Sequence, residues 1–275
     1  MKQSIYFFIN IILFTILFVS CQNDDDVKPD TNNYLKMAEA LSDGSSFNVE
    51  MYSKDSLFVG FNKIFIKVTD KNSGQSVDQA TLVLHPLMDM VTFSHACPVE
   101  NPASTPNTEG YYEGVILFSM PGINSWSVSA DVTANGKTET VKLNIAKVIA
   151  SIPVRKIVMI DSVMMTNGTL KLVKYPISIV KPDEWKVGMN TFEITIHMMQ
   201  DMMNFPCSSD FTLEITPEMP SMGHGSPNNI NPVYTSLGHY VGKVNFTMTG
   251  PWRVNMLIKK SSWTKARKAY FDITF

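Results

Sequence analysis

GHYVGKVNFTMTGPWRV, residues 238–254, repeats an earlier stretch of the same chain, GYYEGVILFSMPGINSWSV at residues 110–128. At a constant offset of 128 residues the two stretches share these pairs without a gap: Gly110 and Gly238, Tyr112 and Tyr240, Gly114 and Gly242, Phe118 and Phe246, Met120 and Met248, Gly122 and Gly250. Trp126 and Trp252 match after a deletion of two residues. The chain therefore contains two copies of one module.

The module has the pattern of short β-strands. Ile64, Ile66 and Val68 alternate with other residues at period two, and the dipeptide at 135–136 is Asn-Gly, which favours a tight hairpin between 128–133 and 138–145. Long helical periodicity is absent. The sequence predicts an all-β chain with two tandem Ig-like antiparallel β-sandwich domains, at residues 47–152 and 153–275.

Composition and motifs exclude several function classes. The 275 residues carry 23 Lys plus Arg against 25 Asp plus Glu, so the basic stripe of a nucleic-acid-binding protein is not expected. The common hydrolase, nucleotide-binding, zinc-protease and Cys-x-x-Cys motifs are missing, and we expect no enzyme. Methionine is frequent, with 18 residues, which suggests a role beyond average packing.

The N-terminus has the pattern of an export signal. An apolar run at 5–19 follows Lys2 and predicts a signal peptide over residues 1–20. The run ends in LFVSC, which resembles the lipobox of bacterial lipoproteins and implies a lipid on Cys21; ordinary cleavage beside a free cysteine is the alternative. The acidic run at 24–26 is similar to the surface-export signal of Bacteroidota lipoproteins.

These resemblances imply a lipoprotein of the bacterial cell envelope, in the outer membrane, whose lipid on Cys21 makes the membrane its partner. The polar segment at 21–46 suits a flexible tether, with a short helix at 34–41 as an option.

A loop of the second copy gathers soft metal ligands. Met219, Met222 and His224 fall within six residues, and thioether and imidazole groups suit Cu(I), whereas Ca²⁺ and Mg²⁺ require clustered carboxylates. His239 and Met248, on and beside the Gly-x-Tyr-x-Gly strand, are further candidates. The equally weighted alternative is that these methionines fill gaps in the core.

Met219-Pro-x-Met222-Gly-His224, followed by the glycine-rich repeat that ends in Trp252-x-Val254, resembles the YtkA-like domain, which is related to the FixH family. The resemblance implies exported β-sandwich domains associated with copper handling and with oxidase assembly. It leads us to expect a lipoprotein that binds or transfers copper as Cu(I), with an oxidase-assembly or metal-efflux component as partner. The alternative is a surface-exposed Ig-like interaction module that binds no metal.

The first copy departs from this motif. Met88, Met90, His95 and Met120 are its metal candidates, but the Met-Pro-x-Met-Gly-His sequence is lost and packing is the favoured explanation. We therefore expect the second copy to be the main Cu(I) site. A third cluster, residues 197–203 with Cys207, is either another Cu(I) site, a partner-binding loop or core filler, and the pairing of Cys97 with Cys207 is left open.

Overall fold

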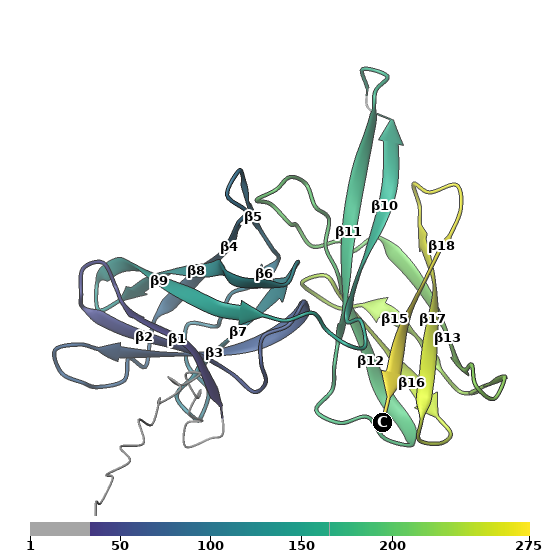
Figure 1. Ribbon diagram of the computed structural model, residues 1–275, viewed down its shortest axis with the longest axis horizontal. Coiled ribbons are helices and arrows are strands. Elements are labelled where there is room, and N and C mark those ends of the chain that lie inside the picture. The colour runs from purple at the N-terminus through teal and green to yellow at the C-terminus, as the bar shows by residue number, and fades with distance from the viewer. Residues whose placement is uncertain (1–33, 165) are drawn as a thin grey trace, which may run out of the picture.

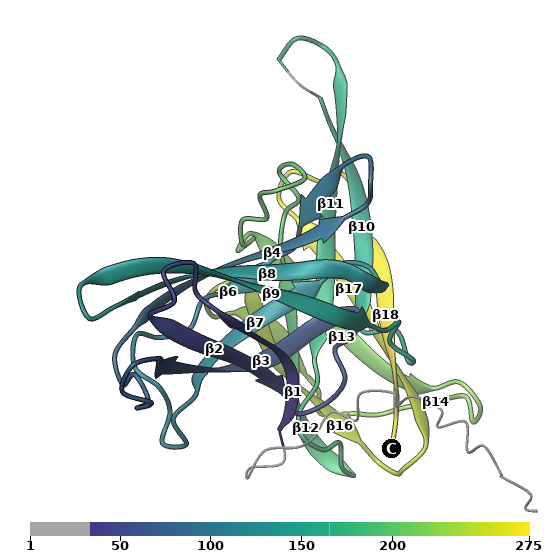
Figure 2. The ribbon, with the colours of Figure 1, turned by 60° about the vertical axis from the view of Figure 1, so that its left-hand side comes forward.

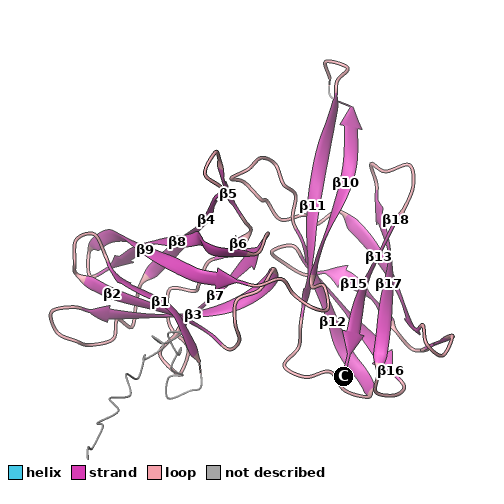
Figure 3. Ribbon diagram, viewed as in Figure 1, coloured by secondary structure: helices cyan, strands magenta, loops and turns pink. Residues whose placement is uncertain are grey.

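The computed structural model describes residues 34–164 and 166–275, and over these residues the chain is built from strands, turns and loops without a helix (Figure 1, Figure 3). They accordingly contain no helix that could span a membrane. The strands form two successive antiparallel β-sandwiches, which confirms the predicted fold class. The signal peptide and Cys21 lie outside the described residues.

Nine strands build the first sandwich. They are β1 (Leu35–Leu41), β2 (Phe47–Ser53), β3 (Gly60–Asp70), β4 (Thr81–Asp89), β5 (Ser94–Ala96), β6 (Val99–Glu100), β7 (Tyr112–Phe118), β8 (Gly122–Ala134) and β9 (Lys137–Val148). One sheet has the order β1-β2-β3-β7-β6 and the other β5-β4-β8-β9. Between β8 and β9 the turn residues Asn135 and Gly136 both have positive φ, at 52° and 74°, as the Asn-Gly signal predicts.

Nine strands also build the second sandwich. They are β10 (Lys156–Met164), β11 (Leu170–Val180), β12 (Gly188–Ile196), β13 (Phe211–Met219), β14 (His224–Gly225), β15 (Ile230–Tyr234), β16 (His239–Phe246), β17 (Pro251–Lys260) and β18 (Arg267–Thr274). Their sheet orders, β10-β11-β12-β16-β15 and β14-β13-β17-β18, repeat those of the first sandwich strand for strand. The two sandwiches therefore share one topology, as the sequence repeat requires.

Equivalent residues stabilise each of the two sandwiches internally. Trp126 and Trp252 are 2% and 1% exposed, and each closes the core between its two sheets. Asn62 Oδ1 accepts the amide of Phe58 at 3.0 Å, and Asn190 Oδ1 accepts the amide of Lys186 at 2.9 Å, so each buried amide fixes the loop that enters β3 or β12. The repeat is thus conserved in hydrogen bonding as well as in packing.

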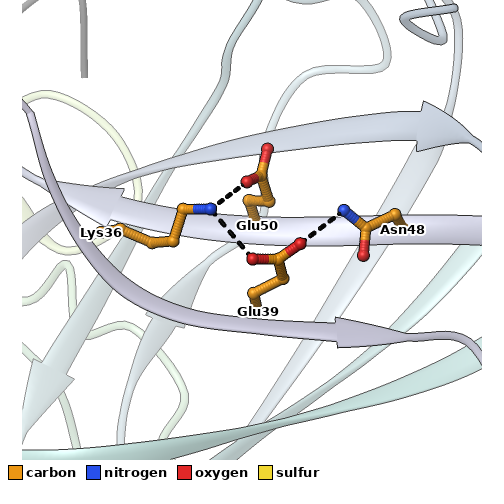
Figure 4. Close-up of polar contacts among 4 residues, drawn as sticks. All are labelled: Lys36, Glu39, Asn48 and Glu50. Carbon is orange, nitrogen blue, oxygen red and sulfur yellow. Dashed lines mark hydrogen bonds and ion pairs between the residues drawn. The ribbon is translucent and has the colours of Figure 1, made fainter. Parts of the chain in front are cut away.

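The segment expected as the end of the tether is a strand instead. β1 pairs with β2 from Leu35 to Leu41, which corrects both the tether boundary at residue 46 and the optional helix at 34–41. Figure 4 shows polar side chains that tie the two strands: Lys36 Nζ contacts Glu50 and Glu39, and Asn48 Nδ2 donates to Glu39 Oε1 at 2.9 Å. Local periodicity was weak because the order of β1 comes from its partner strand.

The connection between the sandwiches is short. β9 ends at Val148 and β10 begins at Lys156, so the expected boundary between residues 152 and 153 falls in the connection. The β10–β11 hairpin extends beyond the rest of the second sandwich in both views (Figure 1, Figure 2). Its exposed apolar side chains are Val158, Ile160, Met164, Leu170 and Leu172.

Candidate metal centre

A tight hairpin brings the thioether of Met219 and the imidazole of His224 onto neighbouring strands. Met219, the last residue of β13, is the register partner of His224, the first residue of β14. The amides of Met222 and Gly223 both donate to the carbonyl of Met219 at 3.0 Å, which closes the turn between the strands. Directly paired antiparallel residues have Cβ atoms about 4.5–5.5 Å apart, within reach of one small ion for side chains of this length.

A tryptophan ring packs against the histidine of this pair. The His224 ring lies perpendicular to the Trp252 ring, with 5.6 Å between the centroids. Trp252 is held in turn, because its Nε1 donates to the carbonyl of Met248 at 2.9 Å. Met219 is 2% exposed, and its methyl group lies where a side chain at Gly250 would stand, 3.3 Å from an ideal Cβ. The glycine therefore leaves room for the thioether.

Met222 and Met248 lie at the outside of this centre. Met222 is in the turn and 60% exposed, so its thioether can reach a metal only from the solvent side. Met248 is 38% exposed and takes part through its carbonyl, which orients the tryptophan. We define the second-domain centre as Met219, His224 and Trp252, with Met222 as its outer thioether.

His239 is not part of this centre. It begins β16, whereas Phe246, which packs on Trp252, ends β16, so roughly 23 Å of strand separates them. Its Nδ1 lies 2.5 Å from Glu193 Oε1 and its Nε2 lies 2.7 Å from Glu100 Oε1. With both ring nitrogens on carboxylates, His239 has no lone pair to offer a metal. It joins the second domain to β6 of the first domain instead.

The His239 contact is charged and sensitive to pH. Burial lowers the pKa of His239, but the hydrogen bonds to Glu100 and Glu193 outweigh this effect and raise the pKa from its usual value of 6.5 to about 9. Since the folded-state pKa is raised, this stabilisation is complete below about pH 6.5 and is lost as pH rises through 9. Nearby His197 stays neutral, because burial lowers its pKa to about 4.

We therefore expect the two domains to uncouple between pH 7 and pH 10, and His239→Gln to uncouple them at pH 7. NMR relaxation, which gives a rotational correlation time for each domain, measures the effect. His85→Gln is the matched control, because His85 pairs with Asp131 at 3.1 Å inside the first domain and is exposed. Unchanged correlation times in His239→Gln would show that other contacts carry the interface.

The first domain contains the same arrangement, formed by two of the metal candidates named for that copy. Met88 on β4 is the register partner of His95 on β5, and the His95 ring is perpendicular to Trp126 at 5.5 Å between centroids. Trp126 Nε1 donates to the carbonyl of Met120 at 3.0 Å. The Met88 methyl lies 3.1 Å from an ideal Cβ at Gly122. Met88, His95 and Trp126 therefore correspond one for one to Met219, His224 and Trp252.

Two additional loop residues explain why the Met-Pro-x-Met-Gly-His motif is absent from the first copy. Six residues separate Met88 from His95, but four separate Met219 from His224, so the motif loses its spacing while the strand pairing is kept. The remaining first-domain candidates have other roles. Met90 is partly buried against the core, and Met120 is 39% exposed and accepts the hydrogen bond from Trp126 through its carbonyl. The similar spacing from His95 to Trp126 and from His224 to Trp252 is the sequence signal that could have shown the equivalence.

The third cluster forms a loop that contacts the first domain. His197 is 1% exposed and pairs with Cys207 in an isolated bridge, and the carbonyl of Met202 accepts the amide of Ala96 at 2.9 Å. Within the described residues Cys97 and Cys207 are both free, so they form no disulfide with each other. Among residues 34–164 and 166–275, no three His, Cys, Asp or Glu residues are grouped to hold a metal, so a metal site there depends on thioethers.

One comparison with known proteins concerns most of the second domain. The YtkA-like family model matches residues 169–256, which include Met219, His224 and Trp252 but make up less than half of the chain. A comparison with curated proteins found no match.

Among solved structures, the chain is similar to FdeC, described as a broadly conserved Escherichia coli adhesin, at 14% identity. The similarity covers 84% of this chain and 64% of that chain, with a TM-score of 0.26. The chain therefore spans less than two thirds of the length of that structure, and a similarity this distant carries no argument about function.

Proposed function

We propose that this chain is a non-catalytic lipoprotein of the cell envelope that binds copper as Cu(I) and transfers it through the second-domain centre. Met219 and His224 are the inner ligands, and Met222 is the outer thioether that receives or releases the ion. The lipid on Cys21 attaches the chain to the outer membrane. An oxidase-assembly or metal-efflux component is the partner that exchanges the copper.

The observation that carries the proposal is the register pairing of Met219 with His224 beneath a tryptophan. Soft thioether and imidazole ligands select Cu(I) over the harder ions of the envelope. The centre is also asymmetric in exposure, since Met219 is 2% exposed and Met222 is 60% exposed. A buried ligand retains an ion and an exposed one offers it to a partner, which suits transfer better than permanent storage.

Anaerobic titration of the purified chain against a competing Cu(I) chelator tests this proposal. We expect the variant Met219→Leu/Met222→Leu/His224→Asn to bind one Cu(I) fewer than wild type, because leucine keeps the volume of methionine while it removes the sulfur. The matched control is Met256→Leu/His85→Asn, which changes a buried methionine of the same core and an exposed histidine of the first domain.

Equal Cu(I) binding by wild type and the triple variant would refute the second-domain site. A chain that binds no copper at all would favour the alternative, an Ig-like interaction module whose methionines are packing. The specific observation behind that alternative is the β10–β11 hairpin, whose exposed apolar side chains give a partner a surface to cover.

A further inference from the structure

We infer that the first domain holds a second Cu(I) site, formed by Met88 Sδ and His95 Nε2 and closed by the Trp126 ring. This inference rests on the proposed function in its choice of ion, but it uses residues of the other domain. The first-domain site and the second-domain centre then have the same types of ligand but differ in their exposure to solvent. Met90 and Met120 are not among its ligands.

The hydrogen bond at Nδ1 of His95 supports this inference. Its Nδ1 lies 2.9 Å from the carbonyl oxygen of Ala96, and because a carbonyl can only accept, Nδ1 carries the proton. The neutral ring then has its lone pair on Nε2, which is the form that binds a metal. Histidine ligands are commonly fixed by such a hydrogen bond from the other ring nitrogen.

The Nε2 lone pair of His95 is buried in the protein. His95 is 6% exposed, and its Nε2 has no hydrogen-bond partner among the described residues. Buried polar atoms are normally paired, and an unpaired one requires an explanation. The cross-strand neighbour of His95 is Met88, whose thioether cannot donate a hydrogen bond but can share a soft metal ion with the imidazole. A bound Cu(I) would satisfy Nε2.

The two sites differ in how an ion reaches them. Met88 and His95 are both 6% exposed, whereas the second-domain centre has a partly buried histidine and the exposed Met222. β5 is three residues long and lies at the edge of its sheet, so its displacement is the route by which an ion would enter the first site. The first-domain site should therefore exchange its ion more slowly than the second.

The experiment counts Cu(I) on the purified chain and on variants that remove one site at a time. Met88→Leu/His95→Asn removes both ligands of the first site, and the asparagine amide can still donate to the Ala96 carbonyl. Its matched control is Met51→Leu/His85→Asn, because Met51 is a fully buried methionine of the same core whose strand partners are Ala38 and Ile66. Thermal unfolding confirms that each variant is folded.

We expect two Cu(I) for wild type and the control, and one for Met88→Leu/His95→Asn. If wild type binds one Cu(I) and only the Met219→Leu/Met222→Leu/His224→Asn variant loses it, the first-domain site is refuted and the proposed function stands. If the single ion is lost only in Met88→Leu/His95→Asn, the proposed second-domain site fails and this inference stands. Absence of copper from wild type refutes both.

A second readout does not depend on counting. The chain has four tryptophans, and Ag(I), a soft monovalent ion that resists redox chemistry, can be added with NMR observation of their indole N–H signals. We expect the signals of Trp126 and Trp252 to shift and those of Trp185 and Trp263 to stay. The Trp126 shift should disappear in Met88→Leu/His95→Asn. If the Trp126 signal of wild type does not shift when Ag(I) is added, the inference is overturned.

Discussion

Trp252→Ala is expected to lower the free energy of unfolding of the second domain by about 3–5 kcal/mol. The side chain is 1% exposed and packs against Phe246 and His224, so its removal leaves a large cavity between the two sheets. The Met248 carbonyl also loses the hydrogen bond from Nε1. Denaturant unfolding followed by the amide signals of the second domain measures the loss.

Trp252→Phe and Trp263→Ala are the comparisons. Phenylalanine keeps most of the ring volume, so we expect a smaller loss than for alanine. Trp263 is only partly buried and its Nε1 has no partner among the described residues, so alanine there should also cost less. A loss below about 1 kcal/mol for Trp252→Ala would contradict its position as the centre of this core.

Gly242→Ala is expected to destabilise the pairing of β15 with β16 by about 1–3 kcal/mol, the range of steric overpacking. An ideal Cβ at Gly242 would lie 2.4 Å from the carbonyl oxygen of Ile230 and 2.7 Å from the amide nitrogen of Pro232. Both are backbone atoms, so no side-chain rotation can relieve the contact. Hydrogen exchange of the Val241 and Lys243 amides, beside the altered residue, together with urea unfolding, reports the change.

The first copy provides the matched control for this substitution. Gly114 corresponds to Gly242, but there an ideal Cβ would lie 3.1 Å from Pro102 Cγ and 3.2 Å from the Glu100 carbonyl. Small shifts can absorb these distances, so Gly114→Ala should cost clearly less than Gly242→Ala. Equal losses would show that the close backbone contacts at Gly242 do not set the cost, because the effect of alanine on the unfolded chain is the same at both positions and stabilises the fold.

The candidate centre was only partly predictable from the sequence. Met219 and His224 were found because the ligands are close in the chain, where a motif can show them. Met88 and His95 have the same register pairing, but their loop is longer and breaks the motif. His239 was expected as a ligand from its place on the repeated strand. In the tertiary structure, however, its two ring nitrogens are hydrogen-bonded to Glu193 and Glu100.

The sequence by itself determined the features that depend on local chemistry: period-two alternation fixed the strands, Asn135-Gly136 fixed a hairpin, and the repeat at an offset of 128 fixed two sandwiches of one topology. Only the tertiary structure decided which residues contact each other across strands and between domains. β1 is a strand because it pairs with β2, and His239 forms an interdomain ion pair with Glu100. His95, beside Met88, has a buried ring nitrogen that finds no partner within the described part of the chain. The pattern of a single segment shows which residues share a face, but it does not show which partner strand or domain those residues will contact.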